Sequence, residues 1–248
     1  MRVILLLMAA FSMLATVSVS AQQAVVEFSA DTVETDPDQG TRNGKLYMGN
    51  NRIRTEFDIN GKTMIQIMDL TKQQALMINP EERTYMRLGA GGGMPGGGTP
   101  EPMDDPCAGM QNISCKKLGV EKVNGRPAIK WEISSDEASE TGPMVFWIDE
   151  ERKFPIRQEM PDGSMMEMKF VRKETVDGRV TEKWVMTATR PGGQTMTSTQ
   201  WYDPELKINI REDHGDEYSR VLKNIKPGKQ PPALFTVPEG YREISTQQ

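Results

Sequence analysis

The stretch from Gly44 to Leu88 constrains the fold most, because short alternating segments are separated there by turn residues. In Arg52–Ile59, apolar or small side chains alternate with charged ones, as expected for a strand with one buried face and one exposed face. Asn60-Gly61 follows, a dipeptide typical of two-residue hairpin turns. The pattern predicts an antiparallel meander with strands at Gly44–Met48, Arg52–Ile59, Thr63–Asp69, Gln74–Ile78 and Arg83–Leu88. We expect its apolar side to carry Ile53, Phe57, Ile65, Ile67, Leu76 and Ile78.

The rest of the chain continues in the same style, from a first strand at Ala24–Val33 to a last one near Leu234–Val237. Asn124-Gly125, Asp162-Gly163 and Asp177-Gly178 mark further turns. Helical spacing is confined to Ser219–Ile225, a candidate short helix, and a second short helix could begin at Asp104 or Asp105. The sequence therefore predicts a mainly β fold, a strongly curved antiparallel sheet or unclosed β-barrel with few short helices.

The N-terminus has the three parts of a secretory signal peptide: Arg2, an apolar core, and a small-residue cleavage site ending at Ala21. We expect residues 1–21 to be removed and residues 22–248 to form a single domain. A Gly/Pro-rich stretch at residues 89–106 interrupts it, and its composition indicates a flexible insertion. No later segment is apolar enough to span a bilayer. These features predict export to the periplasm of a Gram-negative bacterium, or secretion.

The only cysteines are Cys107 and Cys115. In an exported protein such a pair indicates a disulfide. A metal or redox site would require more ligands or a C-x-x-C spacing, and the sequence has neither. The sequence therefore predicts a structural Cys107–Cys115 bond.

Composition argues against several classes of function. The formal net charge is −5 with both signs mixed along the chain, which does not favour nucleic-acid binding. The single histidine, His214, lies among Asp213, Asp216 and Glu217, and a solvated loop is a simpler interpretation than a metal site. No G-x-S-x-G elbow accompanies it. We therefore expect no catalytic residues, no metal and no cofactor, and we predict that the protein is not an enzyme.

Methionine is unusually abundant, with 18 residues. Thioethers can bind soft metals such as Cu(I), but here they are scattered along strands rather than clustered with His or Cys. An adaptable apolar interior is the alternative that we favour, because methionine repacks readily. That interior is either a core closed by loops or a pocket for an acyl-type guest. The predicted lining residues are Ile53, Phe57, Trp131, Phe146, Met166, Met168, Phe170, Trp184 and Met186.

Several segments in order resemble one family: GKLYMGNNRIRTEF, DLTKQQALMINPEERTYMRL, VFWIDEERKFPIRQEM and ALFTVPEGY. The chain resembles the LolA-like superfamily of outer-membrane lipoprotein carriers, especially its branch described as a domain of unknown function. The resemblance implies an unclosed barrel with a lidded hydrophobic cavity, and acyl-chain or lipoprotein binding in a bacterial envelope. The chain departs from the carriers in its Gly/Pro-rich insertion with a cysteine pair, its few helices and its many methionines.

Two functions follow from these observations. In the first, the protein holds an acyl chain, a lipid or a lipoprotein in a hydrophobic concave face. In the second, it is an envelope interaction or stress-sensing protein with a filled core, and its partner is another envelope protein. The sequence does not name the ligand.

Overall fold

The structure is a computed structural model that describes residues 26–38, 40–59, 61–88, 105–107, 112–135 and 142–245. The predicted signal peptide and most of the predicted Gly/Pro-rich insertion lie outside these residues. Within them, no helix is both long enough and apolar enough to cross a membrane.

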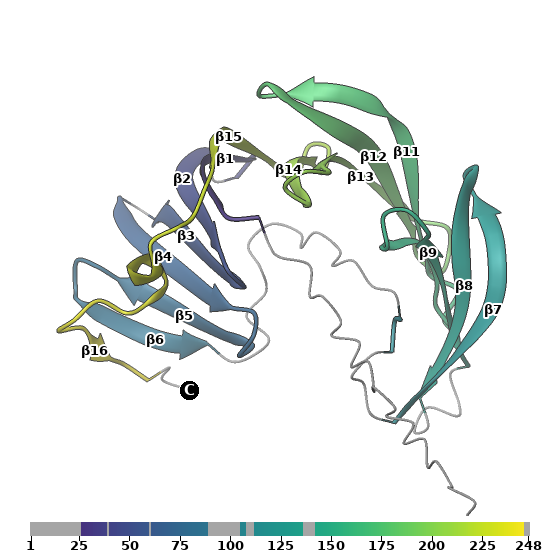
Figure 1. The fold of residues 1–248 in the computed structure, drawn as a ribbon, viewed down its shortest axis with the longest axis horizontal. Helices are drawn as coiled ribbons and strands as arrows, with labels where there is room; N and C mark the ends of the chain where they lie inside the picture. Colours follow the sequence, from purple (N-terminus) through teal and green to yellow (C-terminus); the bar gives the residue numbers. More distant parts are fainter. Residues whose placement is uncertain are drawn as a thin grey trace, which may run out of the picture.

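The described strands form one 16-stranded sheet, curved into an open arch (Figure 1). All neighbouring strands are antiparallel except β16, which runs parallel to β6. The sheet order is β16-β6-β5-β4-β3-β2-β1-β15-β14-β13-β12-β11-β10-β9-β8-β7. The strands are β1 (Phe28–Asp36), β2 (Gly40–Gly49), β3 (Arg52–Ile59), β4 (Lys62–Asp69), β5 (Gln74–Asn79), β6 (Thr84–Leu88), β7 (Ile113–Val123), β8 (Arg126–Ser135), β9 (Met144–Asp149), β10 (Pro155–Glu159), β11 (Met165–Val176), β12 (Arg179–Thr189), β13 (Thr195–Asp203), β14 (Ile208–Asp213), β15 (Ser219–Pro227) and β16 (Arg242–Glu243). The predicted curved, unclosed β fold is confirmed.

Two predicted helices are wrong. Ser219–Ile225 belongs to β15, because its backbone pairs with β1 on one side and β14 on the other. The described residues Asp105–Cys107 form a turn rather than a helix. In the described part of the chain the only helical element is η1 (Pro232–Phe235), a short 3-10 turn.

The predicted apolar side of the Gly44–Leu88 meander is also wrong, because its residues divide between the two faces. The β3–β4 hairpin pairs Phe57 with Met64 and Ile53 with Met68. Ile65 and Ile67 therefore lie on the other face, where they are the cross-strand partners of Glu56 and Arg54. A one-residue change in register moves every side chain of a strand to the other face.

The face that carries Ile53 and Phe57 is the concave one. On this face Phe28 and Leu46 pack against Val176, at the end of β11, and Leu206, in the turn before β14. These segments lie several strands away in the sheet, and only the inside of a curve brings such strands into contact. We therefore call this face concave and the opposite face convex.

The C-terminal segment covers the convex face of β2–β6. Leu234, Phe235, Val237 and Tyr241 pack there with Ile65, Ile67 and Ile78. Gly49 is required at this contact, because a side chain on it would collide with the Phe235 ring. The yellow segment in Figure 1 runs from β15 past β3 and β4 to β16, which pairs with β6 at the edge of the sheet.

The units β7–β10 and β11–β14 are an internal repeat. In the first, Arg126 binds Asp149 and Glu151; in the second, Arg179 binds Asp203 and Glu205. The hairpin turns also match, with positive φ at Asn124 and Gly125 in one and at Asp177 and Gly178 in the other. These are the φ values that a type I′ turn requires. A register shift follows Lys117 in β7 and Phe170 in β11, at equivalent positions.

The convex tryptophans of the two repeats have the same surroundings. Trp147 donates its indole N–H to Glu121 and lies under the cations of Lys130 and Arg157. Trp201 donates to Glu174 and lies under Lys183 and Arg211. Cation–π contacts of this kind stabilise a ring whose outer surface would otherwise be exposed. Each unit therefore builds its convex face in the same way.

Candidate functional site

Methionine side chains gather on the concave face. The strand registers place Met48, Met64, Met68, Met77, Met86, Met144, Met166, Met168, Met186 and Met196 on it. Within this set Met48 and Met168 are buried and Met196 is exposed, whereas the others are half-buried. Met165 is a described methionine on the convex face. The concave face is therefore apolar and partly accessible, and it is lined by flexible, polarizable side chains.

All of the predicted lining residues lie on the concave face, but in two separate groups. Trp131, Phe146, Met166, Met168, Phe170, Trp184 and Met186 lie on neighbouring strands from β8 to β12. Ile53 and Phe57 lie on β3, and five strands separate β3 from β12 in the sheet. The structure brings the first group together and leaves the second group apart from it.

The lining residues differ in accessibility. Trp184 is 1% exposed and Met168 is buried beside it. The ring of Phe154, from the turn between β9 and β10, lies 5.3 Å from that of Trp184, edge to face, and Phe170 lies 5.5 Å away on the adjacent strand. Trp131 and Phe146 are half-buried and belong to none of the buried clusters of the described residues. Trp184 and Met168 are thus core, and the half-buried side chains form the accessible surface.

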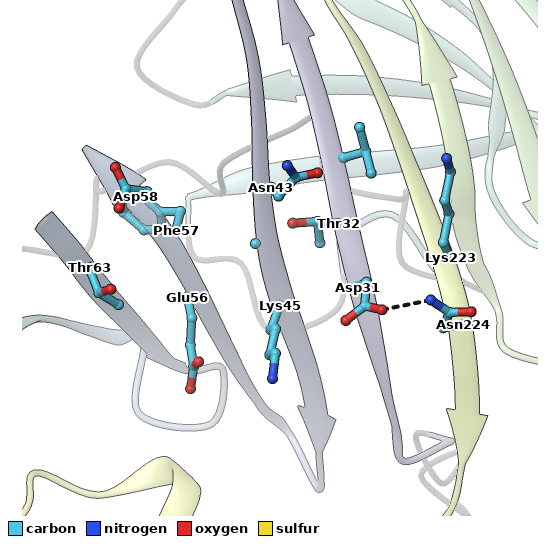
Figure 2. A pocket seen from close by; sticks show the side chains of 12 residues that line it. Asp31, Thr32, Asn43, Lys45, Glu56, Phe57, Asp58, Thr63, Lys223 and Asn224 are labelled. Atoms are coloured by element: carbon cyan, nitrogen blue, oxygen red, sulfur yellow. Dashed lines mark hydrogen bonds between the residues drawn. The ribbon is translucent and has the colours of Figure 1, made fainter. Parts of the chain in front are cut away.

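A shallow polar pocket of about 600 Å³ lies over β1–β4 and β15. Figure 2 shows Asp31 joined to Asn224, whose Nδ2 donates to Oδ2 at 2.7 Å, with Lys45 and Glu56 on the neighbouring strands. Gly44 is needed here, because a side chain on it would collide with the backbone oxygen of Glu56. Phe57 is the one predicted lining residue in this pocket. Sequence reasoning missed the pocket, because alternating charges look the same on any exposed strand face.

The cysteine pair forms the predicted disulfide. Cys107 and Cys115 are bonded, with their Cα atoms 6.2 Å apart. Among the described residues, potential metal-ligating atoms come together only at Asp105 and these two cysteines. A disulfide sulfur is not the thiolate that binds metals, so this group is a structural crosslink. His214 lies in the β14–β15 turn, with its ring 5.8 Å from that of Tyr218.

The electrostatic effects in the repeats have structural causes. The hydrogen bond from Trp147 lowers the pKa of Glu121, and that from Trp201 lowers the pKa of Glu174. Burial raises the pKa of Tyr202. The lowered pKa values of Glu121 and Glu174 thus follow from the hydrogen bonds that hold the two convex tryptophans in place.

Residues 31–153 match the family model of a domain of unknown function, DUF4412. Comparison with curated protein sequences finds no match. Among solved structures, the fold is similar to a LolA superfamily protein from Nitrosomonas europaea, at 11% identity over 86% of this chain and 90% of that one, with a TM-score of 0.41. It is also similar to a DUF1329 family protein from Desulfovibrio piger, at 14% identity over 87% and 91% of the two chains, with a TM-score of 0.38. The first of these two structures is of a protein from the superfamily that the sequence resembles.

Proposed function

We propose that the protein is a binding protein, not an enzyme, and that it holds the acyl chain of a lipid or lipoprotein on its concave face. One observation carries the proposal: methionines and aromatic residues from many strands point to the same face and remain half-buried there. Contiguous apolar surface that stays partly accessible often marks a binding site in a soluble protein. Methionine suits a flexible hydrocarbon guest, because it is unbranched and polarizable.

The expected affinity is modest. Full burial of a methylene contributes about 0.8 kcal/mol, so contact with one face contributes about 0.4 kcal/mol. A chain of about 15 methylenes then gains roughly 6 kcal/mol, a dissociation constant on the order of 0.05 mM.

The same proposal includes the location. The signal peptide expected from the sequence and the Cys107–Cys115 bond both support export to an oxidising compartment. We place the protein in the periplasm of a Gram-negative bacterium, with removal of residues 1–21 before folding.

Native mass spectrometry of protein purified from its own host tests the proposal, together with displacement of a fluorescent fatty-acid probe. Met166 and Met165 offer a matched pair, since both are half-buried neighbours on β11 and only Met166 faces the concave side. We expect M166Q to weaken probe binding severalfold and M165Q to leave it unchanged. A ligand-free spectrum combined with no probe binding would refute the proposal.

The alternative is an envelope interaction or stress-sensing protein with a filled core and an envelope protein partner. The observation that favours it is the covered concave face around Trp184, where Phe154 leaves no room for a guest. Capture of an envelope protein by a ligand-free chain, with M166Q and M165Q behaving alike, would support this alternative.

A further inference from the structure

The second repeat shows how the concave face of one unit is covered. The turn between β9 and β10 places Phe154 on Trp184, and Arg152 from the same turn binds Glu182, with Nε 2.8 Å from Oε2. Beneath this cover, Glu182 and Ser198 are both 3% exposed. The turn of the first repeat thus acts as a lid for the second.

The first repeat has no such lid among the described residues. It ends at β7, the last strand of the sheet, so no unit precedes it there. Trp131 is the counterpart of Trp184. Trp131 on β8 pairs with Phe146 on β9, and Trp184 on β12 pairs with Gln200 on β13, in the same register of the two repeats. Trp131, Ile129 and Phe146 are half-buried, and Val120 on β7 is 56% exposed.

The two faces differ in polarity at two positions, in the direction opposite to their exposure. Glu182 and Ser198 are buried in the covered repeat, whereas their counterparts Ile129 and Met144 are half-buried in the open repeat. At the two neighbouring positions the exposure is the same and the residue type changes: Lys173 and Val120 are both exposed, and Gln200 and Phe146 are both half-buried. Solvent exposure ordinarily favours polar residues and burial apolar ones. The repeat therefore carries apolar side chains where stability alone does not call for them, which indicates an occupant.

Two lysines lie beside these apolar residues on the same face. Lys117 is paired across the strands with Trp131, and Lys122 with Pro127, and both lysines are exposed. Glu121, the acidic residue of β7, bonds instead to Trp147 and Lys130 on the convex side. This gives the open face a basic rim in a chain whose net charge is −5. The indole N–H groups of Trp131 and of its covered counterpart Trp184 have no hydrogen-bond partner among the described residues, whereas those of Trp147 and Trp201 donate to glutamates.

We infer that the open face, formed by Val120, Ile129, Trp131, Met144 and Phe146, binds a long-chain fatty acid. The acyl chain lies across β7–β9, and the carboxylate lies at the β7 edge, where Lys117 and Lys122 supply positive charge. This inference rests on the proposed acyl-chain binding and assigns it to one site and one ligand class. It excludes Trp184 and Met168 from ligand contact.

The four tryptophans provide the test, because Trp131 faces the open site, Trp184 is covered, and Trp147 and Trp201 are convex. A bromine-labelled long-chain fatty acid quenches indole fluorescence on contact, and the unlabelled acid serves as the blank. We expect W131F to abolish most of the bromine-specific quenching and W184F to retain it. Circular dichroism checks that both variants are folded.

The charge is tested separately. The double variant K117Q/K122Q should weaken fatty-acid binding by up to about fivefold, because an ion pair with an exposed lysine contributes at most about 1 kcal/mol. It should leave binding of the uncharged methyl ester unchanged. Lys173→Gln, which replaces an exposed lysine on the concave face of β11 outside the open site, is the control and should change neither.

Each other outcome overturns the inference in a distinguishable way. Fatty-acid binding with quenching that persists in W131F means that the chain lies elsewhere on the concave face, and the proposed function stands. Quenching of Trp131 by a brominated phospholipid but not by the fatty acid reassigns the ligand. A dimer that V120K converts to a monomer makes the face a contact between copies of this chain. No binding of any acyl probe refutes the proposed function as well.

Discussion

The buried ion pairs of the repeats allow a quantitative test, for which Asp149 is the best position. Asp149 is 1% exposed and accepts hydrogen bonds from Arg126, from the backbone N–H of Glu151 at 3.0 Å and from that of Arg152 at 2.7 Å. Substitution to Ala removes all of them and leaves the half-buried Arg126 with only the exposed Glu151 as a carboxylate partner. Breaking a buried pair in this way costs about 3–5 kcal/mol.

The variant D149N separates the charge from the turn. At the equivalent turn between β5 and β6, the neutral Asn79 accepts from the N–H groups of Glu81 and Glu82. An amide at position 149 should therefore keep the turn bonds and lose only the charge-assisted bonds to Arg126, at a cost of about 2 kcal/mol. The repeat predicts the same order for Asp203, which accepts from Arg179, Glu205 and Leu206.

Urea unfolding followed by tryptophan fluorescence measures these free energies. Glu151→Gln is the control, because this side chain is 62% exposed and its bond to Arg126 should contribute less than about 1 kcal/mol. We expect D149A to be the least stable, D149N to be intermediate, and E151Q to be close to the unsubstituted protein. If D149A and E151Q unfold at the same urea concentration, the buried pair does not hold the unit together and the reasoning is wrong.

Three further predictions follow from other contacts. Reduction of the Cys107–Cys115 bond, whose cysteines are 8 residues apart, should lower the free energy of unfolding by roughly 2–3 kcal/mol, measured by denaturation with and without dithiothreitol. Glu121 has a lowered pKa, so its stabilising bond to Trp147 is present above the ordinary pKa of a glutamate and is lost as the pH falls through the lowered value; NMR titration should show the pKa rising in W147F. Phe235→Ala should lower the free energy of unfolding by about 3–5 kcal/mol, because it leaves a cavity in the cluster on the convex face. Hydrogen exchange should show that the backbone amides of β16 lose protection as β16 separates from β6. Unchanged protection of β16 would mean that its backbone pairing alone holds the C-terminal segment.

The strands were predictable because two local signals agree along most of the chain. Alternation defined Arg52–Ile59 with its observed bounds, and Asn-Gly or Asp-Gly marked the hairpins that follow β7 and β11. Which face is concave was not predictable, because it depends on curvature set by contacts between distant strands. Phe57 and Ile65 are both apolar residues of alternating strands. The β3–β4 hairpin pairs Phe57 with Met64, so Ile65, the next residue, lies on the opposite face.

The candidate site was predictable in residue type but not in grouping. The methionines and aromatic residues do share one face, as alternation within each strand predicted. Whether a given side chain is covered depends on its neighbours in space, such as Phe154 on Trp184, and strand patterns do not contain this information. The helical spacing of Val221, Leu222 and Ile225 was misleading because it reflects only the local sequence. Hydrogen-bonded pairing of this segment with β1 and β14 makes it a strand.

One of the segments that carry the family resemblance, VFWIDEERKFPIRQEM, has a structural task in this fold. Its Trp147 lies under Lys130 and Arg157 on the convex face, and its Asp149 holds the turn. The second repeat retains the counterparts Trp201, Asp203 and Arg211. Residues shared by both repeats therefore specify the unit, and they say little about what it binds. The acyl-chain binding that we propose therefore depends on positions where the repeats differ, such as the exchange of Glu182 and Ser198 for Ile129 and Met144 on the open face.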